Sequence, residues 1–190
     1  MVLRADLRWA TRNSLERMSG TTVRAAKPGD AAAIAHVHVC SWRVAYRGLV
    51  PDDVLDGLSV EHREGVWRKL LSEDAEASFT LVAERNGDVA GFCSVAAPSC
   101  DDDAGDRTCE VAAIYVDLDA WRAGVGRALL DAALSEVRQG RWEEATVWVF
   151  AENAGANAFY ERFGFAPDGG EVRHEPSGQM VVRLRASLTG

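Results

Sequence analysis

Apolar and polar residues follow one another along the chain with periods that predict short strands and amphipathic helices. Alternating or continuous apolar runs indicate strands, and apolar positions three and four residues apart indicate helices. Asn86-Gly87 separates two of the runs and predicts a hairpin. We expect strands at residues 22–26, 79–84, 89–97, 109–116 and 145–150, with a closing pair of strands near 171 and 181. We expect helices over residues 28–46, 59–71, 124–140 and 153–164, and a short helix that begins at residue 51.

This order predicts an α/β fold, in the broad sense that includes α+β, in which helices cover both faces of a mixed sheet. The chain has 190 residues, 47% of them hydrophobic, so we expect one domain with a sizeable core. We place that domain at residues 21–190. Residues 1–20 carry arginines and leucines at helical spacing, and we treat them as an extension without an assigned role.

A glycine pair joins the strand at 109–116 to the next helix. Gly124 and Gly126 open that helix, where unpaired backbone N–H groups and the positive end of the helix dipole favour an anion. Leu129 stands where a Rossmann fingerprint needs a third glycine or alanine, and Gly126-Arg127-Ala128 lacks the Gly-Lys-Ser/Thr of a P-loop. The segment predicts another type of diphosphate site, or only a tight turn between strand and helix.

A second segment lies beyond the strand at 145–150. Asn153 is expected to cap a helix that Gly164 ends. The apolar residues on one face of this helix are Ala156, Phe159, Tyr160 and Phe163.

Together the two segments resemble the GNAT acetyltransferase superfamily. Gly124-Val125-Gly126 is similar to the acetyl-CoA pyrophosphate motif of that family, and the run from Asn153 to Phe165 is similar to its "N-x-x-A-x-x-F-Y-x-x-x-G-F" motif. The resemblance covers most of the chain, from about Thr22 to Arg185, and it implies a mostly antiparallel sheet.

The resemblance also implies acetyl-CoA as the acetyl donor and coenzyme A as the product. It places the pantetheine arm along the backbone of the strand that ends at 116 and the diphosphate on the glycine pair. The residues implied for the coenzyme are Ile114, Tyr115, Val116, Arg122, Ala123, Gly124, Val125, Gly126, Arg127, Asn153 and Tyr160. In one departure, the family usually has Arg or Gln where this chain has Trp121, with Arg122 as the neighbouring cation.

Acetyl transfer to an amine needs a base, because an alkylammonium group with a pKa of about 10.4 is protonated at neutral pH. Glu110 is the candidate, since some family members use a strand glutamate. We expect it to point the same way as Ala112 and Ile114, whose apolar surroundings raise its pKa. The alternative is a solvated glutamate at a strand edge. His36, His38 and His62 are competing bases that packing or solvation also explains.

The departing thiolate needs a hydrogen-bond donor. The resemblance places the hydroxyl of Tyr160 near the coenzyme sulfur, where it is expected to donate a hydrogen bond rather than transfer its proton. The alternative is a core aromatic residue with a satisfied hydroxyl.

The net charge of the chain excludes only some classes of acceptor. A formal net charge of −8 argues against a general nucleic-acid binder and favours a cationic small molecule or peptide. The family lines its acceptor site with the first helices and the loop before the fourth strand, which implies Trp42, Tyr46 and 101–103. A polyamine, an aminoglycoside and a basic peptide terminus all fit an acidic rim. Core packing is the alternative for Trp42, and a solvated loop for the acidic residues.

Four cysteines, at 40, 93, 100 and 109, form no metal-type pairs, and no secretory or long apolar span precedes them. We therefore expect a reduced, cytoplasmic protein without a metal or membrane association; a homodimer is a family-level expectation. The expected function is an N-acetyltransferase that moves an acetyl group to a primary amine by direct attack in a ternary complex. The alternative is a catalytically idle acyl-CoA-binding sensor or scaffold module.

Overall fold

The computed structural model describes residues 20–73, 78–101, 103–175 and 177–189. The expected extension over residues 1–20 lies outside these ranges apart from Gly20. None of the helices in the described ranges combines the length and the apolar character that a membrane crossing requires.

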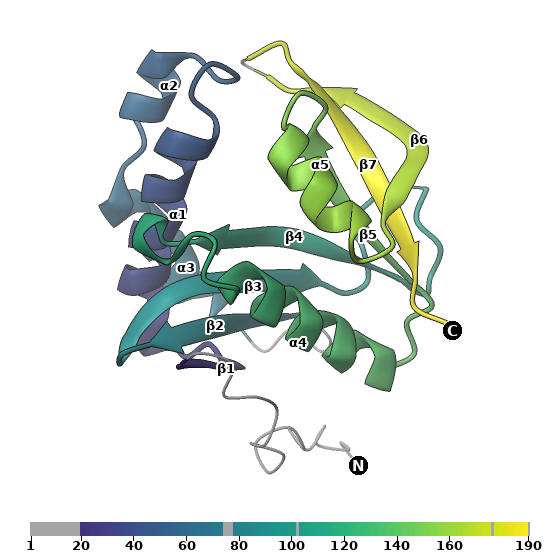
Figure 1. Ribbon diagram of the computed structural model, residues 1–190, viewed down its shortest axis with the longest axis horizontal. Coiled ribbons are helices and arrows are strands. Elements are labelled where there is room, and N and C mark those ends of the chain that lie inside the picture. The colour runs from purple at the N-terminus through teal and green to yellow at the C-terminus, as the bar shows by residue number, and fades with distance from the viewer. Residues whose placement is uncertain (1–19, 74–77, 102, 176, 190) are drawn as a thin grey trace.

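Seven strands form one sheet in the order β1-β2-β3-β4-β5-β7-β6 (Figure 1). Neighbouring strands are antiparallel except for β4 and β5, which are parallel. The strands are β1 (Thr21–Ala25), β2 (Phe79–Arg85), β3 (Asp88–Ala96), β4 (Thr108–Val116), β5 (Glu144–Phe150), β6 (Ala166–Arg173) and β7 (Met180–Ser187). The expected mixed, mostly antiparallel sheet is confirmed.

Helices cover both faces of this sheet (Figure 1). They are α1 (Ala31–Ala45), α2 (Asp52–Asp56), α3 (Val60–Leu70), α4 (Val125–Gln139) and α5 (Ala154–Glu161), and short 3-10 turns at Pro28–Asp30 and Leu118–Ala120 precede α1 and α4. On one face, Ile34 of α1 and Trp67 of α3 pack against Phe92 of β3. On the other, Leu129 of α4 packs with Cys93, the next residue of β3. The side chains of β3 thus alternate between two core layers.

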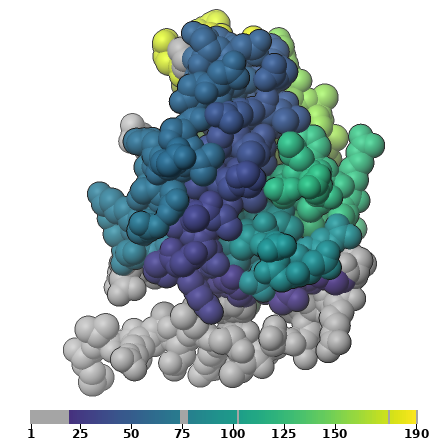
Figure 2. All heavy atoms as spheres, turned by 90° about the vertical axis from the view of Figure 1, so that its left-hand side faces the viewer, coloured from purple at the N-terminus to yellow at the C-terminus, as the bar shows by residue number. Residues whose placement is uncertain are grey.

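The helices α1 and α3 cover one face of the sheet, and on this face α1 lies against the end of β4. Figure 2 shows the side chains of these helices together with the segment around residues 115–125, which lies next to α1. The hydroxyl of Ser41 on α1 donates a hydrogen bond to the carbonyl of Val116 at 2.9 Å. This contact fixes α1 to the end of β4.

β4 and β5 pair only at their beginnings, Thr108–Glu110 with Glu144–Thr146. Beyond those residues β4 stays paired with β3 as far as Val116, while β5 stays paired with β7 as far as Phe150. The facing edges of β4 and β5 are therefore unpaired over the rest of their length, and the two strands diverge in Figure 1.

β4 also contains a bulge. Ala113 pairs with Ser94 of β3 and Val111 pairs with Val95, so Ala112 has no partner across the strand pair. A bulge adds one residue to its strand and reverses the face to which all later side chains point. The side chains before and after Ala112 therefore alternate between the two faces of the sheet in opposite phase.

Candidate active site

The N-terminus of α4 forms an open cradle of backbone amides. Gly124 precedes the helix with a left-handed φ of +83°, and a Cβ on it would meet nothing within 4 Å. The first intrahelical hydrogen bond runs from the N–H of Ala128 to the carbonyl of Gly124. The N–H groups of Val125, Gly126 and Arg127 precede that bond, so they lack helical acceptors and can bind an anion such as a diphosphate.

The loop before the cradle places one cationic side chain and one indole, and the first turn of α4 adds a second cation. Arg122 has a left-handed φ of +61° and is exposed. Arg127 is also exposed and lies 3.4 Å from Asp131, one turn further along α4. The indole N–H of Trp121 donates to the carbonyl of Val116 at 2.8 Å, so this residue fastens the loop to the end of β4.

The unpaired edge of β4 offers a narrower set of backbone groups than the sequence suggested. Asp117 donates its N–H to the carbonyl of Ala90 on β3, and strand alternation then turns the backbone of Tyr115 toward β3 as well. The expectation that Tyr115 offers its backbone to a pantetheine arm is therefore wrong. The backbone groups of Ile114 and Val116 point to the free edge of β4. The Val116 carbonyl already accepts hydrogen bonds from Ser41 and Trp121.

Asn153 caps α5, as its sequence position indicates. Its side-chain oxygen accepts a hydrogen bond from the N–H of Ala156 at 3.1 Å. Gly164 follows the helix with a left-handed φ of +83°. This short helix directs Tyr160 into the core on the α4 side of the sheet.

Tyr160 is buried, with 5% of its surface exposed, and its ring lies edge-on to Phe159 and Phe165 at centroid distances of 5.2 and 5.5 Å. Burial raises the pKa of Tyr160 well above its usual value, and the neighbouring Cys93 and Tyr46 raise it further. The phenol is therefore protonated at neutral pH and can act as a hydrogen-bond donor.

Two further tyrosines and a tryptophan lie on the other side of β4. The hydroxyls of Tyr46, at the end of α1, and Tyr115 are 3.2 Å apart. Trp42 packs edge-on against Tyr46 with ring centroids 4.7 Å apart, and both are half-buried beside the core cluster that contains Leu55. The structure thus brings the two residues that the resemblance implied for the acceptor next to the unpaired part of β4.

Glu110 points to the same face as α1. The prediction that it points the same way as Ile114 is wrong, because the bulge at Ala112 lies between them. Cys109 and Val111 flank Glu110 and belong to the core on the α4 side, as Ile114 does, so Glu110 faces the opposite side. It is half-buried within a paired part of the sheet, not at a solvated edge.

The pKa of Glu110 is raised, as the sequence suggested, but through different neighbours. Burial is the largest cause, and the negative charge of Asp101 adds to it. Hydrogen bonds from the amide of Cys100 and the hydroxyl of Ser99, together with the positive charge of Arg183, oppose the increase. The balance favours a carboxylate that accepts a proton more readily than an exposed glutamate does.

Arg183 of β7 holds the loop before β4 against the sheet. Its side chain is 6% exposed and its guanidinium lies 3.2 Å from Asp101, 2.7 Å from the second carboxylate oxygen of Asp103 and 2.8 Å from Asp168 of β6. The group also lies over the ring of Trp148 at 5.4 Å. The interpretation of 101–103 as a solvated face is therefore wrong for Asp101, whose side chain is 18% exposed, whereas Asp103 pairs with Arg183 and stays 69% exposed.

Sequence reasoning missed both Arg183 and Trp148. Trp148 stands inside an apolar run in which Val147 and Val149 point to the opposite core, so periodicity alone did not mark it. Arg183 lies 80 residues from Asp103 along the chain. Cross-strand pairing of Arg183 with Trp148 brings them together, and only the strand order reveals that pairing.

His38 does not reach the site as a base. It is buried, its Nδ1 accepts a hydrogen bond from the indole of Trp67 at 3.2 Å, and its ring stacks on Tyr115 at 4.9 Å. Burial, followed by the charge of Arg63, lowers the pKa of His38 to about 4. His38 is thus a neutral core residue, which fits the packing alternative.

Comparisons with known proteins agree with this geometry. The model of the acetyltransferase (GNAT) family matches residues 33–165. Uncharacterized N-acetyltransferase YuaI of Bacillus subtilis is 34% identical over 142 residues, which cover 75% of this chain and 78% of that protein.

Solved structures show the same fold. The PaiA N-acetyltransferase of Thermoplasma acidophilum, in complex with coenzyme A, has a TM-score of 0.68 and 17% identity, with 86% of this chain and 97% of that chain covered. The putative acetyltransferase yncA of Salmonella typhimurium, with acetyl-CoA, has a TM-score of 0.66 and 22% identity, with 90% of this chain and 96% of that chain covered.

Proposed function

The chain belongs to the GNAT family of acetyl-CoA-dependent acyltransferases, and we propose that it moves an acetyl group from acetyl-CoA to a primary amine by direct attack in a ternary complex. The observation that carries the proposal is the amide cradle of α4 at the end of β4, next to the unpaired edge that β4 turns toward β5. An extended chain with a diphosphate at one end fits both features.

The coenzyme would be held mainly by backbone groups. The amides of Val125, Gly126 and Arg127 bind the diphosphate, with Arg122 and Arg127 available to neutralise its charge. Ile114 and the N–H of Val116 bind the arm in the manner of an added strand. A Cβ on Gly126 would make only ordinary contacts, 3.5 Å from Val116 and 3.8 Å from Phe159, so the packing of the protein does not itself require this glycine. Acetyl-CoA supplies an acetyl group that its thioester activates.

Glu110 would remove the proton from the acceptor amine, directly or through a water molecule. Its face of the sheet also carries Trp148 and Arg183, and its raised pKa suits a base that works near neutral pH. Tyr115 and Tyr46 provide neutral hydroxyls beside the free part of β4.

Tyr160 would donate its phenolic hydrogen to the coenzyme sulfur as negative charge develops there. The phenol is packed from the side opposite to Glu110, so the two groups approach the reaction from the two faces of the sheet. Because its pKa lies well above the usual value, a hydrogen bond is favoured over full proton transfer.

A thiol-release assay with acetyl-CoA over a panel of amines, amino sugars and peptides tests the proposal when coenzyme A binding is measured on the same sample. Release that depends on both the amine and the enzyme supports it. Coenzyme binding without acetylation of any amine would favour an idle binding module instead.

A further inference from the structure

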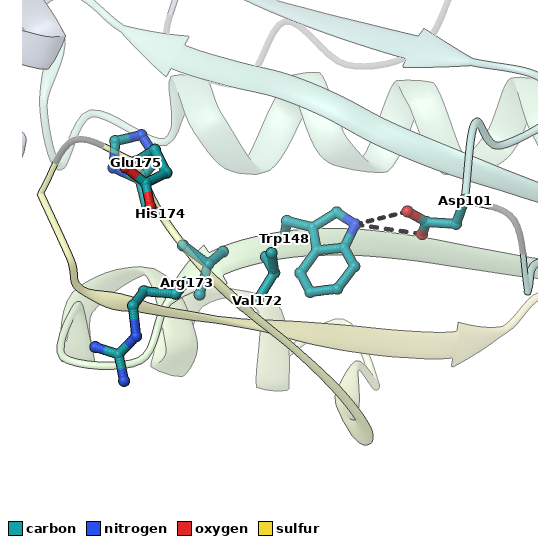
Figure 3. Close-up of a pocket in the computed structure, with 7 residues that line it drawn as sticks. Asp101, Trp148, Val172, Arg173, His174 and Glu175 are labelled. Atoms are coloured by element: carbon teal, nitrogen blue, oxygen red, sulfur yellow. Dashed lines mark hydrogen bonds between the residues drawn. The ribbon is translucent and has the colours of Figure 1, made fainter.

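An open hollow of about 510 Å³ lies on the face of the sheet that carries Glu110 (Figure 3). Its lining comes from the loop before β4, from β5, and from the β6–β7 hairpin. The lining residues are Asp101, Trp148, Val172, Arg173, His174 and Glu175, with Val181.

Strand register places this hollow beside the proposed base. Glu110 pairs with Thr146 of β5, and Trp148 is two residues further along β5 on the same face. Asp101 connects the two sites, because it accepts hydrogen bonds from the indole of Trp148 and its charge acts on Glu110. A molecule in the hollow could therefore direct a substituent toward Glu110.

The floor of the hollow is apolar. Trp148 contributes its indole, and Val181 and Val172 contribute side chains from β7 and β6. Val172 is 50% exposed, which is a large exposure for a valine on a strand. The indole N–H of Trp148 already bonds to Asp101, so the floor offers shape and apolar surface and no free donor from Trp148. His174 closes one end and packs edge-on against Phe150 at 5.0 Å.

The carboxylates around Arg183 are mostly neutralised. Asp103 and Asp168 pair with Arg183, and Asp168 also pairs with Arg185. Asp101 shares Arg183 but keeps a side chain that is 18% exposed at the edge of the hollow. Two carboxylate oxygens can accept more hydrogen bonds than Trp148 and Arg183 donate, so Asp101 can receive one ammonium group as well.

The one arginine that lines the hollow is directed elsewhere. Arg173 donates to the carbonyl of Gly178 at 2.7 Å, and its guanidinium points away from Trp148 in Figure 3. The apolar floor therefore meets Asp101 next to the proposed base, while the exposed carboxylate of Glu175 lines the hollow beside His174, away from Asp101 (Figure 3). This arrangement complements an apolar body that carries a positive charge at its Asp101 end.

Accordingly, and resting on the proposed function, we propose that the acceptor is a primary monoamine on an apolar or aromatic body, which packs on Trp148 and Val172 and directs its amine toward Asp101 and Glu110. Polyamines and aminoglycosides lack an apolar body that packs on this floor, so they fit the hollow less well.

The test compares 2-phenylethylamine with spermidine and kanamycin in the thiol-release assay. We expect kcat/KM for 2-phenylethylamine to be at least tenfold higher than for either polycation. Val172→Lys should lower that kcat/KM about tenfold and leave the KM for acetyl-CoA unchanged. Val66→Lys, at a valine of α3 that is 36% exposed, is the matched control and should change neither.

A binding measurement gives a readout that does not depend on turnover. Calorimetric titration of 2-phenylethylamine into protein saturated with coenzyme A should show binding that Val172→Lys weakens and Val66→Lys does not. Preference for spermidine or kanamycin, or an unchanged response in Val172→Lys, would overturn this inference while leaving the proposed function intact. No thiol release with any amine would overturn both.

Discussion

The indole nitrogen of Trp148 lies 3.0 Å from a carboxylate oxygen of Asp101. This hydrogen bond joins β5 to the loop before β4 at the level where the two strands begin to diverge. Arg183 bonds to the same carboxylate and lies over the same indole ring, so three groups fix one another. The wall of the proposed acceptor site is thereby built from segments that are distant in the sequence.

Removal of Arg183 is expected to destabilise the fold severely. In Arg183→Met, Asp101 and Asp168, whose side chains are 18% and 13% exposed, lose their main cationic partner. The expected loss of unfolding free energy is about 3–5 kcal/mol. Asp103→Asn is the matched control, because the Asp103 side chain is 69% exposed and solvent screens its pair with Arg183, so its loss should be much smaller. Urea unfolding measures the free energy of unfolding of both variants. Equally small losses would show that Arg183 does not stabilise the fold through these ion pairs.

Asp101 is expected to set part of the pH dependence of the reaction. Glu110 must be ionised to accept a proton, so kcat/KM falls as the pH drops through its pKa. The charge of Asp101 raises that pKa, and Asp101→Asn removes the charge while keeping an oxygen for Trp148. The acidic limb of the kcat/KM profile should therefore move to lower pH. An acidic limb that stays at the same pH or moves to higher pH would argue that Glu110 is not the base.

Loss of the Tyr160 hydroxyl is expected to slow turnover without weakening coenzyme binding. Tyr160→Phe keeps the ring that packs on Phe159 and Phe165. The expected decrease in kcat is about 100–1,000-fold, which is the range for removal of one donor to developing negative charge. Steady-state kinetics and a coenzyme A titration on the same preparation measure the two effects. Equal turnover in both proteins would assign Tyr160 to the core alone.

His38 is expected to make the fold sensitive to mild acid. Its pKa falls from 6.5 to about 4 in the folded protein, so the unfolded chain binds a proton more readily between these values. Stability from this group is complete above pH 6.5 and is lost as the pH falls toward 4, with a total of about 3 kcal/mol. His38→Asn, which keeps an acceptor for Trp67, should lack that dependence.

Thermal or urea unfolding of both proteins between pH 4 and 7.5 measures this effect. The difference between the two curves isolates His38, because Glu110 and the other carboxyl groups titrate in both. Parallel curves would show that the histidine can be protonated without loss of packing.

Local signals predicted most of the fold. The hairpin turn at Asn86-Gly87, with φ values of +55° and +94°, and the caps Ser59 and Asn153 all lie where the sequence placed them. Each depends on residues within one turn or one strand, so a local pattern is enough to specify it. The cradle at Gly124 is local for the same reason.

The face of the sheet to which Glu110 points could not be predicted from local signals. The bulge at Ala112 follows from how β4 registers against β3, and no residue within β4 marks it. The network around Arg183 depends on β7 lying next to β5, which strand spacing does not reveal. Long-range pairing thus decided which way Glu110 points and which neighbours set its pKa.

The proposed function depends on binding of the coenzyme diphosphate by the amides at the start of α4. Calorimetric titration of coenzyme A into the wild-type protein, into Gly126→Asp and into Gly65→Asp tests it most directly. A Cβ fits at both glycines, since Gly65 has nothing within 4 Å and Gly126 makes only ordinary contacts, so each variant should fold. We expect binding by the wild-type protein and by Gly65→Asp, and a loss of at least tenfold in affinity for Gly126→Asp. Absence of binding by the folded wild-type protein, or equal binding by Gly126→Asp, would contradict it.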